Sequence, residues 1–112
     1  MRIALVTATV LILSACHGDP PTNTIRYEAD CEKCSVIYTA EPGVDSIVIE
    51  NSWSMMFGAD PSFVPRLQVW YKSHEHDYTA QKATLRIFVN DEKFVDKSDS
   101  GFYFKITGFY IP

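Results

Sequence analysis

The chain has 112 residues and carries 10 basic and 14 acidic side chains, which gives a formal net charge of −4 at pH 7. This length is sufficient for one small domain and no more. The charged residues are interspersed along the chain, which argues against a nucleic-acid-binding protein and against a polybasic segment that attracts membranes. Aromatic residues make up 13% of the chain, and large rings are an efficient way to fill the core of a small domain.

The amino-terminal segment has the three parts of a secretory signal. Arg2 supplies the positive charge, residues 3–13 form an apolar stretch, and Ser14 and Ala15 are the small residues that a signal peptidase requires. The apolar stretch is much shorter than the roughly 20 residues that a membrane-spanning helix needs. We therefore expect residues 1–15 to be a cleaved signal peptide.

The residue that follows this segment changes the expected fate of the mature chain. The sequence LSAC, which ends at Cys16, resembles the lipobox of bacterial lipoproteins. In that family the cysteine sulfur receives a diacylglyceryl group, cleavage occurs just before the cysteine, and the new amino terminus is often acylated. Several acyl chains hold a protein at a membrane more firmly than one chain does. We therefore expect a lipid on Cys16; the alternative is an ordinary signal peptide with an incidental cysteine.

Residues 16–24 are expected to form a flexible tether, because Gly, Pro and small polar residues dominate the sequence HGDPPTNT. The remaining residues, 25–112, then form a single domain. Apolar and polar residues alternate along most of it, and this period of two predicts short β-strands. In chain order, the expected strands are residues 24–29, 35–40, 46–51, 52–57, 66–72, 83–89, 93–96 and 102–110.

Turn residues separate these segments. Glu41-Pro42-Gly43 follows the second of them, and Asn90-Asp91-Glu92 joins the two strands of the clearest hairpin. No segment shows convincing helical spacing. Short strands with turns about every 8 to 12 residues are typical of a sandwich of two antiparallel sheets.

Two cysteines lie between the first two expected strands, in the sequence Cys31-Glu32-Lys33-Cys34. A CxxC motif is able to exchange thiols with disulfides, but redox motifs usually stand at a helix amino terminus that stabilises the thiolate. No helix is expected here, and the cell envelope is oxidising. We therefore expect a structural disulfide that pins a turn, with redox catalysis as the alternative.

A second candidate motif is the sequence HEHD, which contains His74 and His76. In a strand, the two imidazoles would share one face and could hold a metal ion, together with Cys31 and Cys34 as further ligands. The spacing fits no familiar zinc motif, so we expect a solvated loop at this position. No cofactor is expected.

The aromatic residues are too numerous for all of them to point into one small core. Alternation places Trp70 opposite Leu67, Val69 and Tyr71 on its strand, and places Tyr103 and Phe109 together on the last strand. Exposed rings beside polar groups favour contact with a partner. Trp70, Tyr103 and Phe109 are therefore candidate partner-binding residues; alternatively, a loop or residues 60–65 cover this surface.

Several segments resemble the MmpS-type and related bacterial lipoproteins: YEADC at 27–31 with SVIYT at 35–39, NSWSMMF at 51–57, LRIFVNDEK at 85–93 and SDSG at 98–101. The third is similar to that family's I-x-V-D-G-K hairpin and the last to its S-x-x-G turn. The resemblance implies an immunoglobulin-like antiparallel β-sandwich of about seven short strands. The mycobacterial members assist RND transporters that export lipids and siderophores. The chain differs from them in its lipobox, its Asn-Asp-Glu turn and its CxxC motif.

These features together predict a non-enzymatic lipoprotein of the bacterial cell envelope that faces the periplasm or the exterior. Its lipid would hold it at a membrane, and the domain would bind an envelope protein or assist a transporter. The alternative is a thiol-redox or metal-handling protein that uses Cys31, Cys34, His74 and His76.

Overall fold

The computed structural model describes residues 22–73 and 79–112, and every regular element within them is a β-strand. The elements are β1 (Asn23–Ala40), β2 (Gly43–Ala59), β3 (Arg66–Lys72), β4 (Gln81–Val89), β5 (Glu92–Gly101) and β6 (Tyr103–Phe109). All strand pairings are antiparallel. The predicted all-β class is therefore confirmed, with six strands in place of about seven. Among the described residues, no helix is long and apolar enough to cross a membrane.

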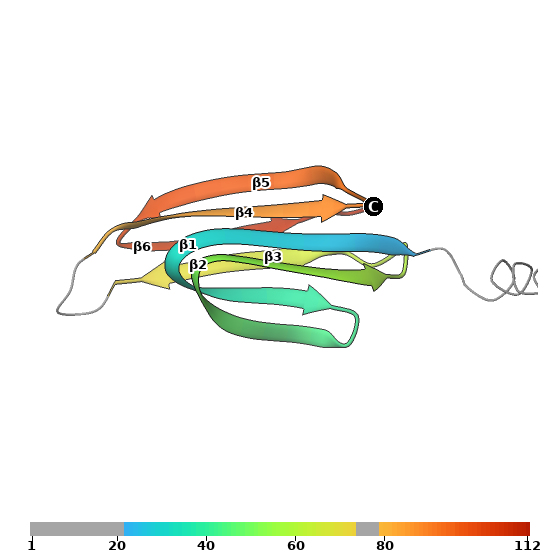
Figure 1. The fold of residues 1–112 in the computed structure, drawn as a ribbon, viewed down its shortest axis with the longest axis horizontal. Coiled ribbons are helices and arrows are strands. Elements are labelled where there is room, and N and C mark those ends of the chain that lie inside the picture. The colour runs from blue at the N-terminus through green and yellow to red at the C-terminus, as the bar shows by residue number, and fades with distance from the viewer. Residues whose placement is uncertain (1–21, 74–78) are drawn as a thin grey trace, which may run out of the picture.

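Two long strands take the place of four expected short ones. β1 has 18 residues, and its pairing with β2 continues through a register shift between Cys31 and Lys33. Such a β-bulge bends a strand without ending it. β2 has 17 residues and passes through Asn51, whose φ of 71° marks its own bend. Figure 1 shows the β1–β2 hairpin bending back on itself.

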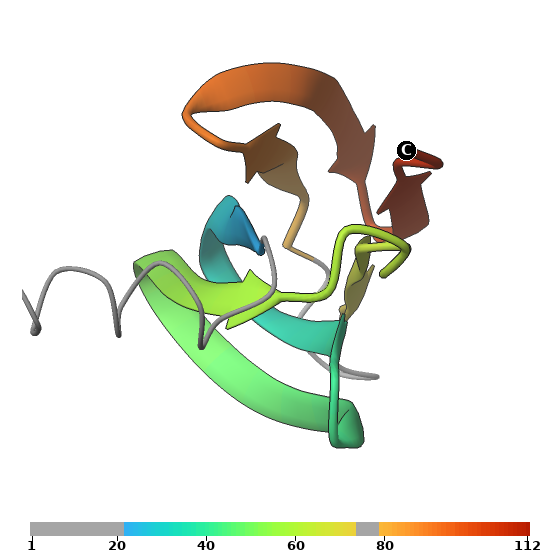
Figure 2. The same ribbon diagram turned by 90° about the vertical axis from the view of Figure 1, so that its right-hand side faces the viewer.

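This bend lets one hairpin contribute to two layers. Residues 25–31 of β1 pair with β4, which in turn pairs with β5. Residues 35–38 of β1 pair with β3, which in turn pairs with β6. β2 follows β1 throughout and lies at the outer edge of both layers. Figure 2 looks along the strands and shows the two layers facing each other.

Apolar side chains from both layers meet between them. The expected inward residues of β3 and β4 are buried: Leu67, Val69, Tyr71, Leu85, Ile87 and Val89. The layers approach closely at Gly108, where a Cβ atom would lie 2.8 Å from methyl groups of Leu85 and Val95. The last expected strand, residues 102–110, is one residue longer at each end than β6: Phe102 lies before β6 and is 54% exposed, and Gly101 before it has a φ of 139°.

Tyr27 connects the two layers from the inside. Its side chain is fully buried, and its hydroxyl donates a hydrogen bond to the backbone oxygen of Thr39 (2.6 Å) and accepts one from the backbone N–H of Arg66 (3.1 Å). Burial raises the pKa of Tyr27 above its ordinary value, against the opposing effect of its hydrogen bonds with Thr39 and Arg66. The first half of β1 is thus fastened to its second half and to the start of β3.

Candidate partner-binding face

The outward side chains of β3 and β6 form a surface in which cations alternate with aromatic rings. The register places Arg66 opposite Phe109, Trp70 opposite Lys105 and Lys72 opposite Tyr103. Directly opposed residues of antiparallel strands have neighbouring side chains. Each of these three pairs therefore joins one cation to one ring. We call these six residues the β3–β6 face.

The three residues predicted as partner-binding all lie on this face. Tyr103 is 61% exposed, Phe109 is 49% exposed, and Trp70 is partly buried. The Arg66 guanidinium lies 5.5 Å from the centre of the Phe109 ring, within the range of a cation–π contact. Their common placement agrees with the expectation, and it leaves the rings open within the described part of the chain.

The charges of the β3–β6 face have no counter-ions on that face. Within residues 22–73 and 79–112, no ion pair joins Arg66, Lys72 or Lys105 to a carboxylate. The remaining outward residues of β3 and β6 are Gln68 and Thr107, which are uncharged. The face is therefore cationic on a chain whose net charge is −4.

Apolar side chains extend this surface across the second half of β1 and onto β2, and we call this extension the apolar margin. Ser35 lies between Val48 and Trp70 in one row of the sheet, and Ile37 lies next to it along β1. Trp70, Ile37 and Val48 help to line a shallow hollow of about 330 Å³. At the bend the margin ends in an oppositely charged pair, Lys33 opposite Glu50.

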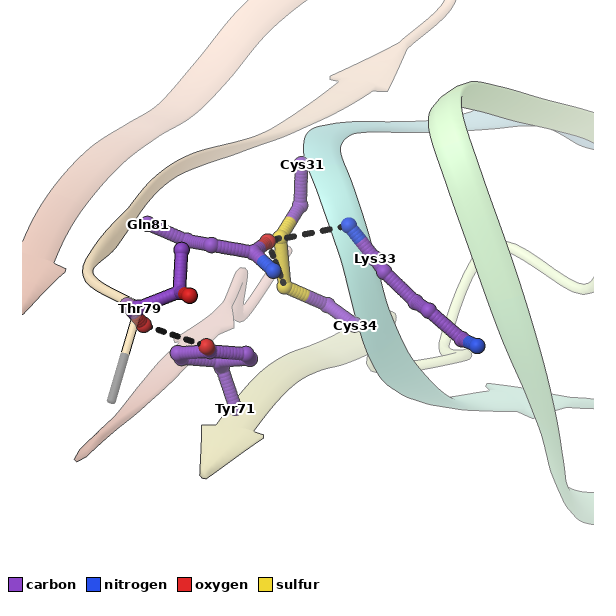
Figure 3. The surroundings of a disulfide bond; sticks show 6 residues. All are labelled: Cys31, Lys33, Cys34, Tyr71, Thr79 and Gln81. Atoms are coloured by element: carbon purple, nitrogen blue, oxygen red, sulfur yellow. Dashed lines mark hydrogen bonds between the residues drawn. A yellow bond between two sulfur atoms is a disulfide. The ribbon is translucent and has the colours of Figure 1, made fainter. Parts of the chain in front are cut away.

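A second hollow, of about 480 Å³, is also lined by Trp70 and reaches the disulfide. Its lining also includes Cys34, Tyr71, Lys72 and Gln81. Figure 3 shows this region, in which the Tyr71 hydroxyl donates a hydrogen bond to the backbone oxygen of Thr79. Trp70 therefore helps to line both hollows.

The disulfide lies inside β1, at its bulge. Cys31 and Cys34 are bonded, with their Cα atoms 5.9 Å apart, and each is 3% exposed. Gln81 Oε1 accepts a hydrogen bond from the backbone N–H of Lys33 (2.9 Å) and lies 2.9 Å from Cys31 Sγ (Figure 3). The predicted pairing is confirmed, but the expected position was wrong, because the motif bends one continuous strand. A loop this short stabilises the fold by about 2 kcal/mol through chain entropy.

The histidines of the proposed metal site, His74 and His76, lie outside the described residues. Among the residues that the structure does describe, no group of three His, Cys, Asp or Glu side chains could hold a metal ion. Cys31 and Cys34 are consumed by their disulfide and would have to be reduced before they could act as ligands. Cys16 and the segment before it also lie outside the described residues.

The outer surface of the other layer has a different character. We call the outward residues of β4, β5 and the first half of β1 the β4–β1 face. Arg86 Nη1 donates to Asp30 Oδ2 (3.0 Å) and to Glu28 Oε1 (3.4 Å). The hydrogen bond with Asp30 raises the pKa of Arg86. Arg86 is therefore paired with carboxylates of the same face, whereas Lys82, also on β4, has no ion pair among the described residues.

Two further cations of the β4–β1 face also have ion-pair partners. Arg26 Nε lies 3.2 Å from a carboxylate oxygen of Glu28, in ion-pair range although not in hydrogen-bond geometry. The Arg26 guanidinium also lies 3.9 Å from the centre of the Phe88 ring. Lys93 Nζ donates a hydrogen bond to Asp96 Oδ2 (2.9 Å), which lowers the pKa of Asp96. The cation–ring contact here is accompanied by counter-ions, unlike that between Arg66 and Phe109.

Sequence reasoning identified the three rings but not the three cations between them. The alternation in RLQVWYK and YFKITGF already shows that Arg66, Trp70 and Lys72 share one side of their strand and that Tyr103, Lys105 and Phe109 share one side of theirs. What the sequence lacks is the pairing of these two strands. That pairing turns two weakly basic patterns into one cationic surface.

No family model matches the chain, and none of the curated proteins is significantly similar to it. The two outer faces, the disulfide and the two hollows are thus the observations from which a function is argued.

Proposed function

We propose that the chain is a non-enzymatic envelope lipoprotein, anchored through lipid on Cys16, whose domain binds a partner through the β3–β6 face. The observation that carries the proposal is the set of three cross-strand pairs, each of one cation and one aromatic ring, with no carboxylate among them. Exposed rings supply contact area at low entropic cost, and unpaired cations supply attraction to negative charge. The lipobox sequence supports the anchor.

The resemblance to MmpS-type lipoproteins extends this proposal to a transport-accessory role. In that reading the partner is an envelope transporter, and the face docks on a part of it that stands outside the bilayer. The long, bent β1–β2 hairpin supports a docking role, because it is continuous through both layers and connects the β3–β6 layer to the other one.

The second candidate is a thiol-redox protein. The observation in its favour is the hollow of about 480 Å³ that reaches Cys34. Both cysteines are nevertheless 3% exposed, and they stand in a β-bulge, where no helix dipole is available to stabilise a thiolate. The binding role has the stronger physical support.

Affinity capture of the native, full-length protein from envelope membranes tests the binding role. We expect the double substitution Trp70→Ala and Tyr103→Ala to abolish the recovery of a cross-linked partner, while Met56→Ala leaves it unchanged. Met56 is a matched control because it is 61% exposed and lies on the other layer. Equal recovery from all three proteins would contradict the role of the face.

The anchor is tested separately, by intact-mass spectrometry of the same protein. We expect a mature chain that begins at Cys16 and carries acyl chains. A mass that retains residues 1–15, or that lacks acyl groups, would contradict the lipoprotein assignment without affecting the result of the capture experiment.

A further inference from the structure

We infer that the partner of the β3–β6 face is the membrane surface itself: a bilayer that contains anionic phospholipids, on which this layer of the domain lies flat. The inference rests on the proposed function, because it takes the lipid on Cys16 as the anchor. It adds to it the identity of the surface that the face recognises.

Charge complementarity is the first argument. Arg66, Lys72 and Lys105 lie on one face of the sheet, and none of them has a counter-ion among the described residues. Lipid phosphates form a two-dimensional array of negative charge, and each Lys or Arg near such a surface strengthens binding about fivefold. A chain with net charge −4 would be repelled by the same array if it approached through most other surfaces. The charge distribution therefore selects this face.

The kind of ring between these cations is the second argument. Trp and Tyr combine an apolar body with a polar tip, and they concentrate where a membrane meets water. Long basic side chains bury their methylene stems while the charged group reaches the headgroups. In the β3–β6 face each ring lies beside a cation across the strand pair, so both kinds of contact would be available at three of its four outward pairs.

The position of the anchor is the third argument. The start of β1 lies at the same end of the domain as the carboxy-terminal end of β6 (Figure 1), where Arg66 is paired with Phe109. Asn23 lies seven positions after Cys16 in the chain, and a fully extended segment of that length spans about 25 Å. A face kept this near the headgroups meets them at a high effective concentration, so weak contacts suffice.

An acidic protein surface would also satisfy three cations. The observations favour the bilayer because the three cation–ring pairs are spread along β3 and β6, from Arg66 with Phe109 at one end to Lys72 with Tyr103 at the other, and are not gathered around one central site. A protein partner is accordingly one of the outcomes that the following experiment distinguishes.

The test uses the native lipidated chain in nanodiscs of phosphatidylcholine, with or without phosphatidylglycerol. The chain contains two tryptophans, so Trp53→Phe leaves Trp70 as the only indole reporter. We expect phosphatidylglycerol to shift Trp70 emission to the blue and to increase its quenching by lipids brominated near the headgroup. The anchor is present in both discs, so the readout reports contact of the face and not attachment of the protein.

Two double substitutions supply the matched comparison. Lys72→Glu with Lys105→Glu should lower the ratio of bound to free face at least about tenfold, from the fivefold contribution of each cation. Lys82→Glu with Lys93→Glu changes the net charge equally, but it alters exposed lysines of β4 and β5, so we expect no effect on quenching. Hydrogen exchange of unsubstituted protein, with slower exchange in β3 and β6 only in anionic discs, gives the same answer without any substitution.

Three results would overturn the inference. One is equal emission and exchange in neutral and anionic discs, and another is an equal effect of the two double substitutions. The third is capture of a protein partner that depends on Trp70 and Tyr103 while the discs have no effect; this would keep the proposed function and reject the membrane as its partner. An unacylated protein would remove the anchor and with it this inference, while the capture experiment would still decide whether the face binds a partner.

Discussion

The two outer faces of the domain use basic residues in opposite ways. On the β4–β1 face, ion pairs join Arg26, Arg86 and Lys93 to the carboxylates of Glu28, Asp30 and Asp96. On the β3–β6 face, Arg66, Lys72 and Lys105 lie beside aromatic rings and have no carboxylate partner among the described residues. The first arrangement satisfies its charges within the fold, while the second leaves them available to something else. This difference is the reason for proposing the β3–β6 face as the recognition surface.

The largest loss of stability is expected from the interior hydrogen bonds that connect the two layers. The two outer faces keep their positions only while these layers stay packed together. Tyr27→Phe removes the hydroxyl that bonds to Thr39 and Arg66. A backbone oxygen and N–H would lose a buried partner, although Thr39 Oγ1 still accepts from the Arg66 N–H (3.0 Å). We expect a loss of about 1–3 kcal/mol in the free energy of unfolding, measured by urea denaturation at neutral pH.

The same residue predicts an alkaline pH dependence. Burial raises the folded-state pKa of Tyr27 above its ordinary value of 10.0, so the folded protein holds its proton where the unfolded chain releases it. The stabilisation is therefore fully present below pH 10 and is lost as the pH rises above that value. Tyr27→Phe should show a shallower decline above pH 10 than the native protein. An equal decline in both would contradict the predicted pKa shift.

A smaller loss of stability is expected when one cation is removed from each face. Arg86→Met leaves the partly buried carboxylates of Glu28 and Asp30 without their shared donor and should cost about 1–2 kcal/mol, a value reduced for the partial exposure of all three groups. Lys105→Met removes a cation that has no ion pair and should change stability by less than about 0.5 kcal/mol. Thermal melts of both variants test the contrast, and equal losses would remove it.

The strands were predictable from the sequence because each shows alternation within itself. Leu85, Ile87 and Val89 are buried as expected, and the Asn90–Asp91 turn has the two positive φ values of 51° and 66° that a tight hairpin requires. The continuity of β1 was not predictable. The alternation is lost from Cys31 to Cys34. The sequence does not show whether this marks a bulge within one strand or a turn between two strands, because both interrupt the pattern in the same way.

The site was predictable only in part, for a related reason. Alternation assigns Trp70 and Lys105 to one side of their own strands, but their pairing joins positions 35 residues apart and depends on the tertiary fold. The paired charges of the β4–β1 face were missed in the same way, since Arg86 and Asp30 are separated by 56 residues. Formal charge counted along the chain gave no sign that the ion-paired Arg26, Arg86 and Lys93 lie on one face and Arg66, Lys72 and Lys105 on the other.

The smallest expected effect is a change in the pKa of a single carboxylate on the β4–β1 face. The hydrogen bond from Lys93 lowers the pKa of Asp96, and Lys93→Met should return that pKa towards its ordinary value, as followed by NMR titration of the side-chain carboxyl. A lowered folded-state pKa stabilises the protein above the unfolded-state pKa, and this stabilisation is lost as the pH falls through the folded-state value. Any stability difference between Lys93→Met and the native protein should therefore vanish in strong acid. Lys105→Met is the control: because Lys105 lies on the opposite face, the pKa of Asp96 should not move, and a shift there would mean that the two faces share one electrostatic network.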